Sequence, residues 1–170
     1  EAVPPPTAFV RHPPGAPAAM RSRLLVMLQF ALIAALAVPW SAQDAGAWLA
    51  TLARLPAVLP VVGGLVVGLW ALYTNRPGNF NIRPEPRSGG RLVTTGPYRF
   101  VRHPMYLAVL LVAAGLVLGD FAAWRIAAFV ALAAVLHAKA AIEERLLPDA
   151  HAVYADYARR TPRLVPFLHL

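Results

Sequence analysis

Four long apolar segments alternate with polar segments along the chain, at residues 24–40, 55–73, 104–119 and 121–141. A helix of about 20 apolar residues, rising about 1.5 Å per residue, is long enough to cross the hydrocarbon core of a bilayer. The third segment is shorter, and Gly119-Asp120 marks a turn into the fourth, so we expect these two segments to form a helical hairpin. The pattern predicts an all-α fold, an integral membrane bundle of about four transmembrane helices with a cytoplasmic C-terminal tail.

The ends of the chain differ from the apolar segments. Residues 1–20 are rich in proline and alanine and have no apolar periodicity, so we expect a disordered N-terminal segment followed by one membrane domain over residues 21–170. The basic start of the first apolar segment is typical of a signal peptide, but no good cleavage site follows it closely, and we expect a retained helix. We expect the last helix to continue past the membrane until Pro148 interrupts it.

The segments between the apolar runs differ in polarity. Residues 41–54 lie close to Trp40 and include Trp48, which favours a short interfacial helix. Residues 74–103 form a polar connection with several prolines and glycines, which excludes one continuous helix. A connection of this length inside a compact domain is usually functional.

Composition supports a lipid-facing protein and excludes several kinds of site. The chain is 58% hydrophobic and only 14% charged, whereas soluble domains are about a quarter charged. The absence of cysteine excludes disulfides, thiolate metal sites and a cysteine nucleophile. No spacing of histidine and acidic residues indicates a metal site.

The distribution of basic residues predicts the orientation in the membrane. The formal net charge is +8, and the basic residues between the spans favour contact with anionic lipid rather than nucleic acid. Arginines gather before the first span, in the connection of residues 74–103 and in the tail. Four spans with both termini in the cytoplasm satisfy the positive-inside rule, and we expect a protein of a bacterial inner membrane.

The most informative stretch is LVTTGPYRFVRHPMY at residues 92–106. A Gly96-Pro97 turn leads into a polar and aromatic run that enters an apolar helix at Pro104, a favoured first-turn residue. His103 and Tyr106 are three residues apart and share one face of this helix entry. The N-terminus of the helix has unpaired backbone N–H groups and a positive dipole, which favour an anionic group such as a carboxylate.

Two further features lie on the same predicted side of the membrane. Glu143 and Glu144 stand at the end of the last span, where carboxylates beside apolar residues usually have a partner. The tail carries Tyr154, Tyr157 and Arg163, which could fold back over a bound cofactor. Lys139 precedes Glu143 by four residues and could be its structural partner.

These residues resemble the isoprenylcysteine carboxyl methyltransferase family and, more distantly, the phospholipid methyltransferases. The resemblance covers residues 75–168 and rests on GPYRFVRHPMY, a helical hairpin, EERLL, Tyr-x-x-Tyr and PRLVP in that order. It implies S-adenosylmethionine as cofactor and a lipophilic small molecule as substrate, entering from the membrane lipid. The stretch between EERLL and the tyrosines is one residue shorter than is usual in relatives and lacks their Phe-Gly.

The resemblance also assigns roles to individual residues. Catalysis falls to His103 and Arg102. The residues that it implies for cofactor binding are Gly96, Tyr98, Arg99, His103, Tyr106, Glu143, Glu144, Tyr154, Tyr157 and Arg163. Which of the two glutamates contacts the cofactor stays open, as does a proton-accepting role for His103 toward a thiol or amine acceptor.

Other interpretations of the same residues remain. His103 could brace the helix start, Arg99 and Arg102 could anchor the chain in the cytoplasmic leaflet, and the tail tyrosines could be interfacial anchors. A membrane reductase of the sterol-reductase type or a non-enzymatic membrane scaffold are the alternative functions. The methyl acceptor, a carboxylate, thiol or amine, and the oligomeric state are not encoded in a readable pattern.

Overall fold

The structure, a computed structural model, describes residues 15–37, 50, 55–75, 79, 90–151 and 153–166. Five α-helices and one 3₁₀-helix have defined bounds within these residues. They are α1 (Ala16–Ala37), α3 (Leu55–Asn75), η1 (Gly96–Arg99), α4 (Pro104–Gly119), α5 (Ala123–Ala150) and α6 (Tyr154–Arg160). The predicted all-α fold is confirmed.

Among the described residues, three helices are long and apolar enough to cross a membrane, at Ala16–Ala37, Pro56–Asn75 and Ala123–Pro148. The fourth apolar helix, α4, has 16 residues, and at about 1.5 Å per residue it falls short of the ~30 Å hydrocarbon core. The chain is therefore an integral membrane protein with three to four apolar helices. The predicted interfacial helix at residues 41–54 falls almost wholly outside the described residues.

Two predicted boundaries were wrong. Residues 16–20, expected to be disordered, form the first turns of α1. Pro17 sits in the first turn, where its missing N–H leaves no helical carbonyl unpaired, and the Gly15 carbonyl accepts the N–H groups of Ala18 and Ala19. The first span therefore begins eight residues earlier than the predicted Leu24, while residues 1–14 and 38–40 lie outside the described part.

The second wrong boundary is at the end of α5, which continues past Pro148 to Ala150. A proline in the last turn removes one backbone hydrogen bond but does not have to end the helix. The N–H of His151 still donates to the carbonyl of Leu147, 2.9 Å away, so the helical pattern bridges the proline. The α4 bounds are those predicted, and α3 ends two residues later than expected.

Glycines allow α3 and α4 to pack closely, as small residues do in membrane helices. A Cβ on Gly64 would lie 2.7 Å from the carbonyl oxygen of Ala108, and one on Gly115 would lie 2.6 Å from that of Ala57. The adjacent Gly63 has nothing within 4 Å of its Cβ position. Close packing through Gly64 therefore fixes where the start of α4 lies against α3.

The helix α1 packs on α5, and its buried residues Ser22, Gln29 and Leu36 are seven apart. At one end of this contact Arg125, 2% exposed, donates from Nη1 to the carbonyl of Leu36 at 2.7 Å. Its Nε lies 2.9 Å from an oxygen of Asp120 in the α4–α5 turn. Arg125 thus ties α1 to the hairpin.

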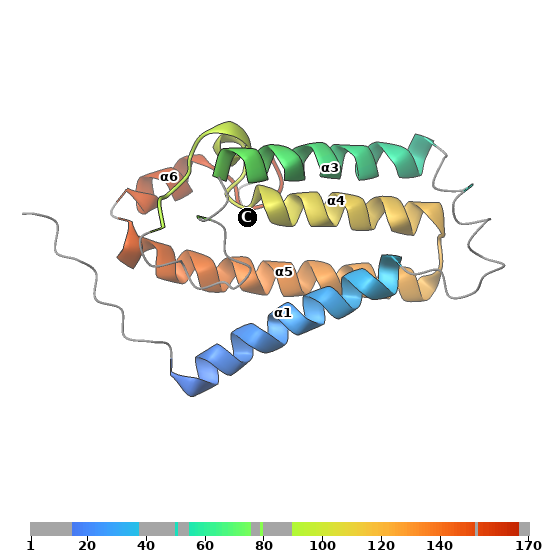
Figure 1. Cartoon of the computed structure of the whole chain (residues 1–170), viewed down its shortest axis with the longest axis horizontal. Helices are drawn as coiled ribbons and strands as arrows, with labels where there is room; N and C mark the ends of the chain where they lie inside the picture. Colours follow the sequence, from blue (N-terminus) through green and yellow to red (C-terminus); the bar gives the residue numbers. More distant parts are fainter. Residues whose placement is uncertain are drawn as a thin grey trace, which may run out of the picture.

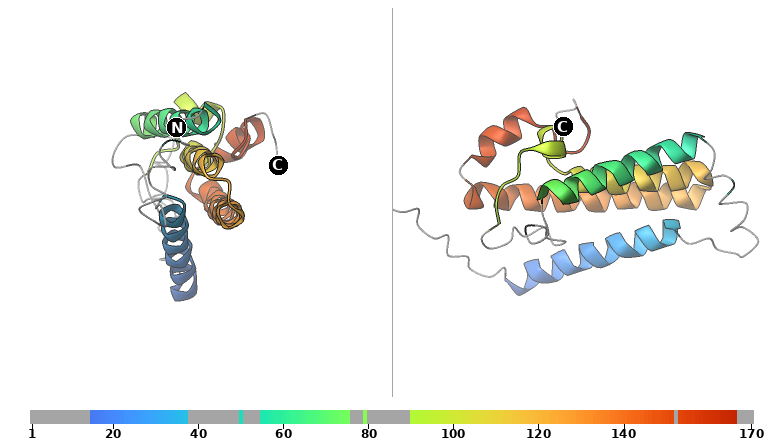
Figure 2. Two further views of the ribbon diagram at one scale, coloured as in Figure 1. Left: turned by 90° about the vertical axis from the view of Figure 1, so that its right-hand side faces the viewer. Right: turned by 45° about the horizontal axis from the view of Figure 1, so that its top comes forward.

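The helices run up and down, so that several segments distant in sequence meet at one end of the bundle. Figure 1 shows the end of α3, the start of α4, the end of α5 and all of α6 at the same end, with the α4–α5 turn at the other. The right-hand view of Figure 2 agrees, and α1 lies along the side of the bundle in contact with α5 and α4. The motif-bearing segments are therefore gathered at one membrane face.

Candidate active site

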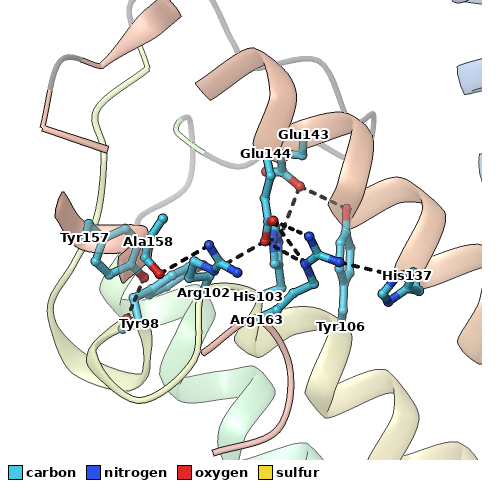
Figure 3. Close-up of polar contacts among 10 residues, drawn as sticks. All are labelled: Tyr98, Arg102, His103, Tyr106, His137, Glu143, Glu144, Tyr157, Ala158 and Arg163. Atoms are coloured by element: carbon cyan, nitrogen blue, oxygen red, sulfur yellow. Dashed lines mark hydrogen bonds and ion pairs between the residues drawn. The ribbon is translucent and has the colours of Figure 1, made fainter. Parts of the chain in front are cut away.

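Glu144 is the centre of a cluster of three basic side chains (Figure 3). Arg163 of the tail donates to both carboxylate oxygens, with Nη2 2.6 Å from Oε2 and Nε 3.1 Å from Oε1. His103 Nε2 lies 2.9 Å from Oε1, and Arg102 Nε lies 3.3 Å from it, in ion-pair range without hydrogen-bond alignment. The Glu144 side chain is only 10% exposed. Its carboxylate is occupied by contacts within the protein. These contacts hold together the end of α5, the RHP segment at residues 102–104 and the tail.

Glu143 has a different environment from its neighbour. Its side chain is 31% exposed, and Oε2 accepts a hydrogen bond from the Tyr106 hydroxyl at 3.2 Å. The same oxygen lies 3.6 Å from His103 Nδ1. Glu143 is therefore the carboxylate of the pair that a ligand can reach.

His103 lies between the two glutamates and stacks on Tyr106. The rings of His103 and Tyr106 are 5.3 Å apart at an interplanar angle of 6°. The His103 side chain is 6% exposed, and both ring nitrogens face carboxylate oxygens. This geometry suits a residue that positions Glu143 and Glu144.

Backbone hydrogen bonds also bind the tail to the segment just before α4. The N–H groups of Arg102 and His103 donate to the carbonyls of Pro162 and Arg163, at 2.8 and 3.1 Å. The bidentate hydrogen bond with Glu144 raises the pKa of Arg163 above its usual range. The tail folds back onto the motif, as predicted, and fixes the backbone at the start of α4.

The helix α6 is tied to the η1 turn by one hydrogen bond. The Tyr157 hydroxyl donates to the carbonyl of Tyr98 at 2.6 Å. Burial raises the pKa of Tyr98 to about 12, with a further contribution from the negative charge of Glu143. Burial also raises the pKa of Tyr157, so both side chains are neutral phenols at ordinary pH.

A cavity of about 130 Å³ opens beside this cluster. The predicted site residues that line it are Tyr98, Arg102, His103, Tyr106, Glu143 and Tyr154. Tyr154 is 2% exposed, and within the described part of the chain its hydroxyl has no hydrogen-bond partner. A buried hydroxyl without a partner is costly, and here it belongs to a residue of the cavity wall, where a ligand could pair with it.

The other predicted site residues lie outside the cavity wall: Gly96, Arg99, Glu144, Tyr157 and Arg163. Gly96 has a φ of +59°, and a Cβ there would lie 2.6 Å from Thr74 Oγ1, so this glycine lets the turn dock on the end of α3. Arg99 is exposed, with its guanidinium over the ring of Phe100 at 5.2 Å. Glu144, Tyr157 and Arg163 lie outside the cavity and hold residues of its wall in place.

Several cavity residues were missed by the sequence reasoning. Leu147 follows Glu143 by four residues on the same face of α5, and His151 is the residue directly after this helix. Ending the helix at Pro148 hid this face. Asn75, at the end of α3, accepts a hydrogen bond from the side-chain amide of Asn79. The same amide accepts from the N–H of Arg91 at 2.8 Å and donates to its carbonyl at 2.9 Å.

The sequence matches the family described as phospholipid methyltransferase over residues 54–153. The chain belongs to this family. The family is part of the isoprenylcysteine carboxyl methyltransferase-like superfamily, so the predicted resemblance is confirmed. Membership supports a membrane methyltransferase.

Two curated relatives carry names drawn from metal resistance. The chain is 37% identical over 129 residues to the cobalt-zinc-cadmium resistance protein CzcN of Cupriavidus metallidurans, covering 74% of the chain and 54% of the relative. It is 35% identical over 128 residues to the nickel-cobalt-cadmium resistance protein NccN of Alcaligenes xylosoxydans xylosoxydans, covering 72% and 54%. The chain thus spans about half the length of the curated relatives it matches.

Proposed function

We propose that this chain transfers a methyl group from S-adenosylmethionine to an apolar or membrane-partitioned small acceptor at the cytoplasmic membrane face. The observation that carries the proposal is the cavity at one end of the bundle, where the reachable carboxylate of Glu143 and the unpaired hydroxyl of Tyr154 belong to one wall. Family membership supplies the reaction class.

The residues of the cavity fit the chemical groups of this cofactor. A carboxylate such as Glu143 can accept hydrogen bonds from ribose hydroxyls or an ammonium group. Arg102 and the N-terminus of α4 favour a carboxylate. Aromatic faces such as Tyr98 attract a sulfonium cation, and Leu92, Val93 and Leu147 offer an apolar surface for a purine ring. The donors and acceptors of the cavity therefore match the polarity of the molecule.

Bound at this site, S-adenosylmethionine would supply an electrophilic methyl group and a neutral thioether leaving group. The protein then has to align the acceptor, exclude water and hold the charged groups; alignment alone can contribute about 7–11 kcal/mol. Glu144 serves this end indirectly, since its three basic partners fix the helix end that presents Glu143. An acceptor that is a carboxylate or thiolate needs no base, whereas an amine or thiol has to lose a proton, and Glu143 and His103 of the cavity wall are groups that can accept it.

The names of the curated relatives raise the question of how this chain relates to metals. Within the described residues no group of three or more His, Cys, Asp and Glu side chains is placed to hold a metal ion. If this chain takes part in metal resistance, we infer that it acts there through the methylated acceptor.

Calorimetric titration of the purified chain in nanodiscs with S-adenosylhomocysteine tests the proposal. We expect binding, and we expect it to weaken when Arg102, which lines the cavity, is changed to alanine. Arg159→Ala is the matched control, because Arg159 lies at the same end of the bundle but is exposed and paired with Asp156. Folded protein that does not bind would overturn the proposal, and binding of NADPH instead would favour the reductase.

The methyl acceptor can be identified with S-adenosylmethionine that carries a labelled methyl group. Label transferred from S-adenosylmethionine into bacterial lipid extracts, isoprenoid acids, small thiols or amines would identify the acceptor class. We expect label in the organic phase of a lipid extract, because the site lies at the end of an apolar bundle. Transfer only to water-soluble acceptors would contradict a membrane-partitioned substrate.

A further inference from the structure

The only lysine of the chain is buried inside the membrane bundle. The other 15 of the 16 basic residues are arginine, and Lys139 lies within the span Ala123–Pro148 with 1% exposure. An ammonium group at this depth is costly and is retained mainly where it has a partner or a function. The contacts of Lys139 therefore bear on the site.

Lys139 joins two helices. Its Nζ donates to Gln29 Oε1 of α1 at 2.5 Å, and Gln29 is itself only 8% exposed. The same ammonium lies 5.3 Å from the centre of the Tyr106 ring, a cation–π distance. Lys139 thus connects α1, which precedes the family match, with a residue of the cavity wall.

Tyr106 carries this connection into the site. Its ring stacks on His103, and its hydroxyl donates to Glu143 Oε2 (Figure 3). Glu143 also follows Lys139 by four residues on the same face of α5. The ammonium therefore supports the tyrosine that binds Glu143 and offsets the charge of that carboxylate at the boundary with the apolar interior.

We propose that Lys139, anchored on α1 by Gln29, is a positioning residue of the candidate active site. It fixes the Tyr106 ring and, through it, the orientation of Glu143. The helix α1 is then part of the functional unit, although it contributes no residue to the wall of the polar cavity. The identity of the bound ligand rests on the proposed function, but the positioning itself does not.

The bundle provides a control for a purely structural role. Arg125 lies 14 residues before Lys139 on α5, is equally buried and also bonds α1, at the carbonyl of Leu36. Its other partners are Asp120 and Trp124, at the end of the bundle away from the cavity. Arg125→Met therefore loosens the same helix pair without touching the site.

The first readout needs no ligand. A fluorotyrosine placed at position 106 reports its surroundings by ¹⁹F NMR in the nanodisc-embedded protein. We expect its signal to shift or broaden in Lys139→Met and Gln29→Leu, to return toward the original position in Lys139→Arg, and to stay unchanged in Arg125→Met. An unchanged signal in the first two variants, or an equal change in Arg125→Met, overturns the inference. Gln29→Leu keeps the ammonium and decides the test if Lys139→Met does not fold.

The second readout is the dissociation constant for S-adenosylhomocysteine. We expect it to rise about tenfold in Lys139→Met, to recover in Lys139→Arg and to stay at the original value in Arg125→Met. If the original protein does not bind this probe, the proposed function fails, and the ¹⁹F result alone decides the positioning role. If it binds and Lys139→Met binds equally well, the positioning role fails while the proposed function stands.

Discussion

Two adjacent glutamates at the end of α5 have separate tasks because a helix turns about 100° per residue. Glu144 turns toward His103 and Arg163, which hydrogen-bond its carboxylate, and toward Arg102, which pairs with it as an ion. Glu143 turns toward the cavity and Tyr106. One residue organises the site, and the other is available to a ligand.

Replacing each glutamate by glutamine separates these tasks. Glu144→Gln leaves three basic groups around a neutral amide, and we expect a loss of about 3 kcal/mol in the free energy of unfolding, since an uncompensated buried charge is costly. Glu143→Gln keeps the Tyr106 hydrogen bond, so we expect an almost unchanged unfolding midpoint but about tenfold weaker binding of S-adenosylhomocysteine. Thermal unfolding and calorimetry on the same samples measure both quantities. Equal effects of the two changes on stability would contradict this division.

The raised pKa of Tyr98 predicts a loss of stability at alkaline pH. Burial and the charge of Glu143 raise its pKa from 10.0 to about 12 in the folded protein. Below pH 10 the phenol is neutral in both states, and its contribution is complete. Between about pH 10 and 12 the unfolded chain releases this proton first, so the free energy of unfolding falls as the pH rises.

The measurement is denaturant unfolding in detergent at several values between pH 8 and 12. We expect Tyr98→Phe to reduce the slope of stability against pH above pH 10. Part of the slope should remain, because burial also raises the pKa of Tyr154 and Tyr157. An unaltered slope in Tyr98→Phe would show that this phenol ionises as freely when folded as when unfolded.

At the residue scale, the sequence predicted which side chains would come together but not which of their atoms would pair. His103 and the glutamates could be expected at one membrane face because hydropathy and arginine placement fixed the ends of the spans. The rotation of α5 about its axis could not be predicted, since apolar residues lie on all sides of this helix and mark no single apolar face. That rotation decides that Glu144, and not Glu143, receives Arg163.

At the scale of the helices, both wrong boundaries lie near prolines. Pro17 lies in the first turn of α1 and Pro148 in the last turn of α5, two positions at which a helix accommodates proline. By contrast, the start of α4 at Pro104 and its end at Gly119 were predicted correctly. There the proline, the turn at Gly119-Asp120 and the apolar run agree with one another.

The packing of α3 on α4 predicts opposite effects of one substitution at two neighbouring positions. A methyl group on Gly64 meets the backbone carbonyl of Ala108, so Gly64→Ala should lower the free energy of unfolding by about 1–3 kcal/mol, the usual cost of overpacking. Gly63 has open space around its Cβ position, and Gly63→Ala should be neutral or stabilise by about 0.5–1 kcal/mol. Unfolding in detergent measures both. Similar effects at the two positions would mean that α3 is rotated relative to α4.

At the scale of the whole molecule, the bundle has one polar end and one simple end. The cavity, the tail and the Glu144 cluster share the end at which α4 begins, and the opposite end has the short α4–α5 turn. Among the described residues, Arg21 and Arg23 in the first turns of α1, Arg99 and Arg102 before α4, and the arginines of α6 and the tail all belong to the polar end. Because basic segments stay on the cytoplasmic side, this asymmetry predicts how the molecule sits in its membrane.

Single cysteines can test this orientation without background, because the chain contains no cysteine of its own. Arg160 is exposed in the last turn of α6, and Phe121 is 73% exposed at the opposite end, so each can be changed to cysteine without disturbing the cavity. In intact spheroplasts, a membrane-impermeant maleimide should label Phe121→Cys and spare Arg160→Cys, and lysis should make both reactive. The opposite pattern would place the cavity outside the cell, where S-adenosylmethionine is not supplied, and a methyltransferase working at that face would be untenable.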